Sequence, residues 1–147
     1  PSVIWLNDRR PDDTDEATWE LRIEGQPIRI EDLRARSRPI VATLDCTGGW
    51  WSEQAWDAVP LSDLIAEPVG RSVHVGSITG YTRHFPIADL AALHLAVGYG
   101  GEALRPGHGA PVRLVVPGRR GPEWIKWVTE VRCSDRPSWL QPPLPLS

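Results

Sequence analysis

The alternation of apolar and polar positions predicts a chain built mainly of strands. Residues 19–25 (WELRIEG) and 72–78 (SVHVGSI) alternate with a period of two, which is typical of strands with one buried face. Residues 39–46 (PIVATLDC) form a continuous run of apolar and β-branched side chains, typical of a buried strand. Further strands are predicted after the turn that opens residues 79–85, over 111–117 and over 124–133.

Three short helices are predicted between these strands. They cover residues 29–36, 60–67 and 86–96, and the last begins at a proline. Residues 47–60, which hold three tryptophans, and the glycine-rich residues 98–111 are predicted as irregular connections. Strands mixed with short helices indicate an α+β fold with mixed β-sheets.

Length and composition fit one soluble globular domain. The 147 residues, 41% hydrophobic and 24% charged, suffice for a hydrophobic core, and the domain is predicted to span residues 1–147. Residues 1–18 are expected to be a loose polar segment, and the proline-rich residues 137–147 an extended tail. A net charge of −3 argues against nucleic acid as a partner. The chain begins at Pro1 without methionine, so a trimmed start and a piece of a longer protein are both open.

Cys46, one of two cysteines, lies in an unusual segment, LDCTGGWW. A turn of Thr47 and two glycines would expose backbone N–H groups next to the thiol, which lowers a thiol pKa and admits a bulky ligand. The thiol could then be a nucleophile or a soft metal ligand, whereas a buried inert cysteine is the simpler interpretation. Cys133, at the end of the last predicted strand, is expected to be structural.

Three basic side chains stand in apolar or glycine-rich surroundings. His108 lies between two glycines, and Arg113 and Lys126 lie inside apolar strand segments. Arg113 and Lys126 each either point to solvent or find a buried anion, and together with the glycine-rich loops they would form a phosphate-binding corner. Two chemistries are therefore open: a Cys–His hydrolase or transferase with His108 as base, and a metallo-cofactor site with Cys46 as the single protein ligand. A plain zinc site is poorly supported, because no further ligand stands at metal-binding spacing from Cys46.

Six segments between about Trp19 and Val131 resemble one known family in their order and spacing. The chain resembles the molybdopterin-binding domain of the sulfite oxidase superfamily, most closely bacterial oxidoreductases of the methionine sulfoxide reductase type. The strongest part is GHGAPVRLVVPG followed by KWV. The segments are WELRIEG, LDCTGGW, VPLSDLI, GSITGYTRHFPI, GGEALRPGHGAPVRLVVPGRRG and IKWVTEV.

This resemblance implies a role for each candidate residue. The Cys46 thiolate would bind molybdenum beside the two sulfurs of the cofactor dithiolene. His108 and Arg113 would contact the pterin or its phosphate, and Lys126 would be a further cofactor contact. The remaining candidates are Thr47 and Gly48, beside the metal ligand, and Tyr81 and Thr79, which would line the site, with Tyr81 and Cys46 as the catalytic candidates.

The implied function is oxygen-atom transfer to or from a small substrate such as an S-oxide or N-oxide. Sulfite is disfavoured, because the arginine-containing segment of sulfite-oxidising members is replaced here by Thr-Gly-Gly-Trp. Thr79 replaces an acidic residue, and the usual longer N-terminal stretch is absent from this chain. The resemblance further implies an extracytoplasmic, exported or membrane-anchored protein supplied by a membrane-bound electron carrier. The alternative is a non-catalytic binding domain of the same fold, with tryptophan-rich loops that hold a ligand or partner.

Overall fold

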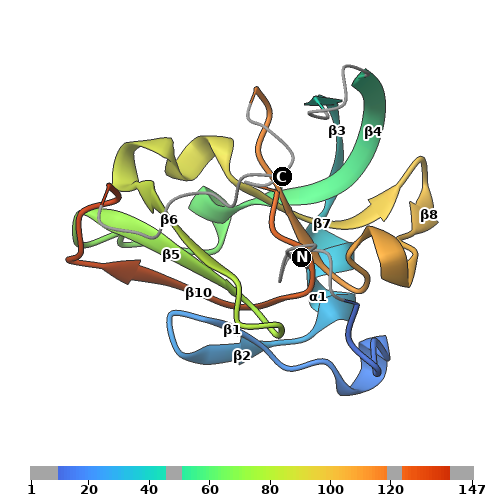
Figure 1. The fold of residues 1–147 in the computed structure, drawn as a ribbon, viewed down its shortest axis with the longest axis horizontal. Helices are drawn as coiled ribbons and strands as arrows, with labels where there is room; N and C mark the ends of the chain where they lie inside the picture. Colours follow the sequence, from blue (N-terminus) through green and yellow to red (C-terminus); the bar gives the residue numbers. More distant parts are fainter. Residues whose placement is uncertain (1–9, 46–50, 119–123, 140–147) are drawn as a thin grey trace, which may run out of the picture.

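The computed structural model describes residues 10–45, 51–118 and 124–139, which form ten strands and one α-helix (Figure 1). Four 3-10 helices within these ranges cover Glu16–Thr18, Leu61–Asp63, Ile87–Ala92 and Pro106–His108. The other elements are β1 (Leu21–Ile23), β2 (Gln26–Ile28), α1 (Ile30–Arg36), β3 (Arg38–Asp45), β4 (Trp51–Pro60), β5 (Ser72–Ser77), β6 (Thr82–Pro86), β7 (His94–Tyr99), β8 (Glu102–Ala103), β9 (Arg113–Val115) and β10 (Val128–Ser134).

The strands form two sheets of five. The first has the order β2-β1-β10-β5-β6 and is mixed, because β1 runs parallel to β10 while the other neighbours are antiparallel. The second has the order β3-β4-β7-β8, and β9 pairs with β7. Mixed sheets with few, short helices confirm the predicted α+β class.

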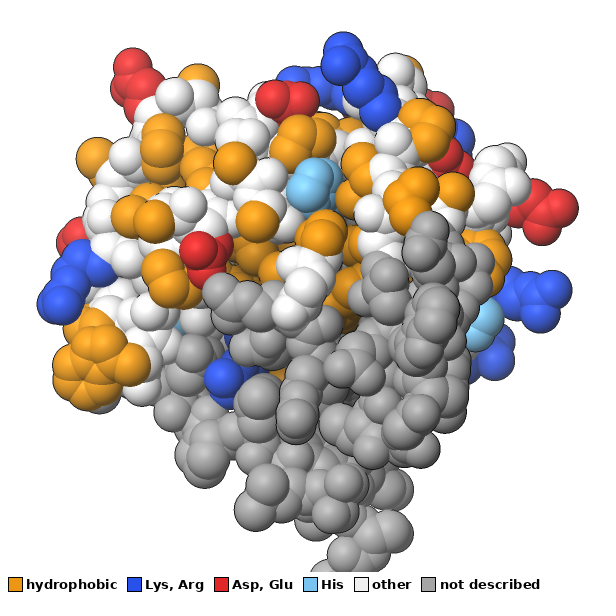
Figure 2. Space-filling model, turned by 90° about the horizontal axis from the view of Figure 1, so that it is seen from above, with side chains coloured by type: hydrophobic (Ala, Val, Ile, Leu, Met, Phe, Trp, Pro, Cys, Tyr) orange, Lys and Arg blue, Asp and Glu red, His pale blue; other side chains and the backbone are white. Residues whose placement is uncertain are grey.

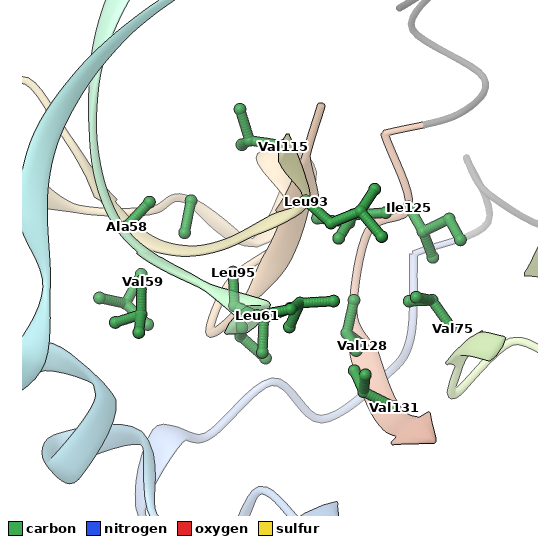
Figure 3. Packing of buried hydrophobic residues seen from close by; sticks show 14 of the residues in the cluster. Ala58, Val59, Leu61, Val75, Leu93, Leu95, Val115, Ile125, Val128 and Val131 are labelled. Atoms are coloured by element: carbon green, nitrogen blue, oxygen red, sulfur yellow. The ribbon is translucent and has the colours of Figure 1, made fainter. Parts of the chain in front are cut away.

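One hydrophobic cluster draws on both sheets. Val75, Val128 and Val131 come from β5 and β10 of the first sheet, and Val59 and Leu95 come from β4 and β7 of the second (Figure 3). All five side chains are fully buried. Burying apolar side chains of this size stabilises the fold by about 1.5–3 kcal/mol each. The sheets therefore share one core.

The structure corrects two predicted connections. Residues 51–60, predicted as loop, form β4, which pairs with β3 on one side and β7 on the other. Residues 98–111 are not wholly irregular, since they contain the end of β7, the short strand β8 and the 3-10 helix Pro106–His108. Both errors arise because pairing between distant segments supplies the backbone hydrogen bonds that local composition does not reveal.

Two predicted helices and several predicted strands, including the last, are shorter than expected. Residues 86–96 form a 3-10 helix only over Ile87–Ala92, and the chain then continues into β7. The helix predicted over 60–67 is reduced to Leu61–Asp63. The last strand begins at Val128 rather than at residue 124, because Trp127 has a left-handed φ of 55° that interrupts extended backbone.

The surface seen from above in Figure 2 carries its charged side chains mainly around the edge, with apolar and uncharged polar atoms between them. Isolated apolar side chains are exposed on several elements, including Val41 on β3 and Trp139 near the end of the described chain. In the described part of the chain, no helix is both long and apolar enough to cross a membrane.

Candidate cofactor-binding site

His108 lies at the end of a tight turn before β9. The turn is closed by backbone hydrogen bonds from the His108 and Ala110 amides to the Arg105 carbonyl, at 2.9 and 3.1 Å, and from the Gly109 amide to the Pro106 carbonyl at 3.2 Å. The side chains of Arg105 and His108 are both exposed. The turn therefore presents two basic groups from a fixed backbone.

Gly109 allows this turn to pack directly against two further basic residues. A Cβ at Gly109 would lie 2.9 Å from the Arg113 Cβ and 3.2 Å from the Lys126 Cβ and Cγ, closer than side chains normally approach. Its φ of 101° also lies in the left-handed region that favours glycine. His108, Arg113 and Lys126, up to 18 positions apart in the sequence, are thus brought together around this glycine.

Arg113 is buried between aromatic rings. Its side chain is 4% exposed, and its Cζ lies 5.2 Å from the ring centroid of Trp56 and 5.7 Å from that of Trp124. Nη1 donates to the His108 carbonyl at 3.0 Å and Nη2 to the Trp124 carbonyl at 3.2 Å. Arg113 therefore does not point to solvent, and backbone carbonyls accept the hydrogen bonds of these two nitrogens.

Lys126 is half-buried, and its Nζ lies 5.6 Å from the ring centroid of Trp127. The Trp127 indole donates to the Pro106 carbonyl at 2.8 Å, so this residue also fastens the His108 turn. Two backbone bonds, Leu114 N–H to the Ile125 carbonyl and Val128 N–H to the Val112 carbonyl, align the Lys126 segment with β9. Several separate hydrogen bonds therefore fix the His108 turn and the Lys126 segment next to β9.

The pKa of His108 reports the charge of this cluster. Desolvation lowers it below the usual value, and repulsion from Arg113, Lys126 and Arg105 lowers it further. Every charged group in that set is cationic, so His108, Arg105, Arg113 and Lys126 form one positive site, called the basic cluster below. Such a site favours an anion with several oxygen acceptors.

The other residues predicted for the site have different outcomes. Cys46, Thr47 and Gly48 lie outside the described residues, directly after β3, which is described from Arg38 to Asp45, whereas the predicted strand covered residues 39–46. Tyr81 is 7% exposed and packs in the hydrophobic cluster. The turn that precedes Tyr81 is held by a hydrogen bond from the Ile78 amide to the carbonyl of Trp127 at 3.0 Å. Trp127 also fastens the His108 turn.

Sequence reasoning did not single out four residues that shape the site. Arg105 adds charge next to His108, whereas Trp56 and Trp124 enclose the Arg113 guanidinium and Trp127 anchors the turn. The excess of tryptophan, eight against one phenylalanine, was the available signal. It indicates large flat surfaces around a pocket or polar group, without indicating which rings provide them.

The described residues fit a phosphate-bearing cofactor. The basic cluster supplies cationic donors for a phosphate, and the absence of a side chain at Gly109 keeps those donors close together. A mixed-sheet α+β domain with such an anion site fits the class of proteins that bind an anionic organic cofactor.

The comparison with known families identifies that class. The model of the oxidoreductase molybdopterin binding domain family matches residues 8–140. The chain belongs to this family, whose cofactor is molybdopterin, and the resemblance found in the sequence is confirmed.

Relatives with different reactions share this domain. A nitrate reductase [NADPH] of Emericella nidulans is 30% identical over 94% of the chain and 21% of that protein. The catalytic subunit MsrP of a protein-methionine-sulfoxide reductase from Gluconobacter oxydans is 28% identical over 80% of the chain and 47% of that protein. The sulfane dehydrogenase SoxCD of Paracoccus pantotrophus has a similar structure, with a TM-score of 0.75 and 28% identity over 84% of this chain and 40% of that chain. The chain thus spans less than half the length of each.

Proposed function

We propose that this chain is the molybdopterin-binding part of an oxidoreductase that transfers an oxygen atom to or from a small S-oxide or N-oxide, with the Cys46 thiolate as the protein ligand of molybdenum. The observation that carries the proposal is the basic cluster, which lies within the residues matched by the family. An S-oxide is favoured by the similarity to a methionine sulfoxide reductase over 80% of the chain.

Each part of the chain has a distinct task in this proposal. His108, Lys126 and Arg105 bind the cofactor phosphate by charge-assisted hydrogen bonds, and the turn amides of Thr47 and Gly48 approach the metal end. Cys46 ligates the metal, and Tyr81 lines the substrate side. The bound cofactor supplies the redox chemistry, while these residues bind it, orient it and exclude water.

Metal analysis tests the proposal. The domain is expressed in a host that makes the molybdenum cofactor, and molybdenum per chain is measured for the wild type and for Cys46→Ser. We expect near-stoichiometric metal in the wild type and a loss, or a changed absorption spectrum, in Cys46→Ser. Cys133→Ser is the matched control, because Cys133 lies on β10, where desolvation and its hydrogen bond to Glu24 raise the pKa of its thiol.

Two results would contradict the proposal. A folded wild type without molybdenum, from a host that loads a related enzyme, would favour the non-catalytic binding domain. Equal loading of wild type and Cys46→Ser would exclude Cys46 as the ligand.

Once loaded, the protein is assayed with a reduced dye against methionine sulfoxide, trimethylamine N-oxide and nitrate, and we expect the S-oxide to be the best substrate.

We further propose that the complete protein works outside the cytoplasm and receives electrons from a membrane-bound carrier. This proposal rests on the family resemblance of the CTGGW segment and the proline-rich tail. Fractionation of the native organism, with an antibody against this domain, tests the location. Recovery in the cytoplasmic fraction alone would contradict it.

A further inference from the structure

Three aromatic rings lie in contact one after another between the protein surface and the basic cluster. Tyr99 on β7 and Trp56 on β4 are direct cross-strand partners, and their ring centroids lie 5.2 Å apart in an edge-to-face arrangement. Trp56 in turn meets Trp124 edge to face, with centroids 5.7 Å apart. The Trp124 carbonyl accepts a hydrogen bond from Arg113, so these three rings, called the aromatic series below, end beside the basic cluster.

The two ends of the aromatic series differ in their access to water. Trp56 and Trp124 are buried, whereas Tyr99 is 37% exposed. A hydrogen bond from the Gly100 amide to the Ala55 carbonyl, at 2.7 Å, holds the end of β7 against β4 and keeps Tyr99 beside Trp56. Of the three rings, only that of Tyr99 can therefore exchange a proton with water.

The indole N–H of Trp56 lacks the partner that a buried donor normally has. Nε1 is buried, and among the described residues it has no hydrogen-bond acceptor. Loss of an electron makes an indole N–H acidic, and an acceptor would take the proton and leave a less oxidising neutral radical. Because Trp56 has no such acceptor, its oxidised ring remains a radical cation, which attracts an electron from a neighbouring phenol more strongly.

We propose that the aromatic series protects the cofactor site from oxidative damage, because it moves an oxidising equivalent from the site to Tyr99 at the surface. A one-electron oxidant such as hydroxyl radical, produced from peroxide at a reduced metal, takes an electron from Trp124 and becomes hydroxide. Trp124 is restored by an electron from Trp56, and Trp56 by an electron from Tyr99, whose phenol proton passes to water. A soluble reductant of the thiol or ascorbate class then returns one electron and one proton to the tyrosyl radical. The inference rests on the proposed cofactor-binding function.

Laser flash photolysis of the cofactor-free protein tests the electron transfer itself. An ultraviolet pulse ionises tryptophan, and a tyrosyl radical formed within one molecule appears at a rate independent of protein concentration. We expect a fast tyrosyl signal in the wild type and its loss in Tyr99→Phe, which keeps the ring and removes the oxidisable hydroxyl. Tyr81→Phe, which removes the other of the two tyrosines, is the matched control and should keep the fast signal. A fast signal in Tyr99→Phe equal to that of the wild type would overturn the proposal.

Trp56→Phe tests whether the electron follows the order of the ring contacts. A phenylalanine ring is much harder to oxidise than an indole, so we expect the fast tyrosyl signal to be lost. Trp139→Phe is the matched control, because Trp139 is 73% exposed near the end of the described chain, and it should keep the signal. A fast signal in folded Trp56→Phe would show that Tyr99 is oxidised by another route, which would contradict the proposal. If Trp56→Phe does not fold, Tyr99→Phe, at an exposed position, decides the matter.

Peroxide treatment of the reduced, molybdenum-loaded protein tests the protective role. We expect oxidised tryptophan at Trp56 and Trp124, located by mass spectrometry of peptides, to accumulate several-fold faster in Tyr99→Phe than in the wild type. Equal accumulation in the two proteins would overturn the protective role. A wild type that binds no molybdenum would refute the proposed function, whereas flash photolysis would still decide whether the aromatic series transfers an electron from Tyr99.

Discussion

Gly109 determines how closely the basic residues of the site approach one another. A methyl group there would collide with the Arg113 Cβ, and the backbone of Gly109 is left-handed. Without that contact, the His108 turn would stand further from β9, and the mutual repulsion that lowers the pKa of His108 would weaken. The close packing at Gly109 thus keeps the charged side chains of the basic cluster near one another. Their mutual repulsion is unfavourable until an anion binds.

Inorganic phosphate should therefore raise the pKa of His108. The pKa is lowered by desolvation and by repulsion from Arg113, Lys126 and Arg105, and a bound anion offsets the repulsion. We expect the pKa of His108 to rise towards its usual value with phosphate concentration and to level off at saturation. Two-dimensional NMR of the imidazole, titrated with pH in the cofactor-free domain, measures it.

The controls separate binding from screening. Sodium chloride at equal ionic strength screens the same charges without occupying the site, and should raise the pKa of His108 less. His94 is the internal control: desolvation also lowers its pKa, but the charged group that acts on it is Asp63. An equal response of His108 to both salts would show that the basic cluster does not bind phosphate.

At this scale the sequence predicted which basic residues gather but not what they contact. The family resemblance implied that His108, Arg113 and Lys126 contact one cofactor, and the structure brings them together around Gly109. The partners of Arg113 were not predictable, because they are the carbonyls of His108 and Trp124. Every residue has a backbone carbonyl, so the sequence does not indicate which carbonyls accept a hydrogen bond from a side chain. That depends on the conformation of the two loops that contain His108 and Trp124.

The pairing of β5 with β6 brings two histidines together on adjacent elements. His74 and His84 are cross-strand partners, with Nδ1 of His74 and Nε2 of His84 3.3 Å apart. Nε2 of His74 lies 3.4 Å from Oε1 of Glu130 on β10, which also contacts Nε of Arg132. Burial, with repulsion from Arg132 and His84, lowers the pKa of His74 to about 4 despite the opposing effect of Glu130.

Mild acid should therefore weaken the first sheet. The folded pKa of about 4 lies below the ordinary value of 6.5, so the unfolded chain takes up the proton first as the pH falls. The stability from neutral His74 is fully present above pH 6.5 and is lost progressively towards pH 4. Urea denaturation should show that His74→Gln loses about 2 kcal/mol less than the wild type between pH 7 and 4.5. Parallel losses in the two proteins would contradict this account.

Elements were predictable where the local sequence pattern determines them, and not where they depend on hydrogen bonds to a distant segment. The strands β1, β3, β5 and β6 and the helix α1 were predicted within a few residues from alternation and apolar runs. The predicted loop that became β4 pairs over Trp56–Pro60 with β7, His94–Tyr99, whose first residues were predicted as the end of a helix. Each segment receives part of its backbone hydrogen bonds from the other, and a local pattern contains no information on that partner.

The two sheets depend on one another because they bury the same cluster. Leu21 on β1 of the first sheet and Leu95 on β7 of the second are 1% and 0% exposed, and both belong to this cluster. Truncation of a buried leucine to alanine costs about 2–5 kcal/mol, from lost burial and the cavity left behind. We therefore expect Leu21→Ala and Leu95→Ala each to destabilise both sheets by a similar amount.

Hydrogen exchange read separately for β5–β6 and for β4–β7 distinguishes a shared core from two independent ones. If the core is shared, the most protected amides of both sheets lose the same free energy in each variant, because they exchange only through global unfolding. Val41→Ala on β3 is the control: Val41 is 66% exposed, and its truncation should change stability by no more than about 0.5 kcal/mol. If Leu95→Ala accelerated exchange in β4–β7 alone, the sheets would be separate units. The basic cluster, which is anchored on β9 and on the segment leading into β10, would then join two units rather than lie within a single domain.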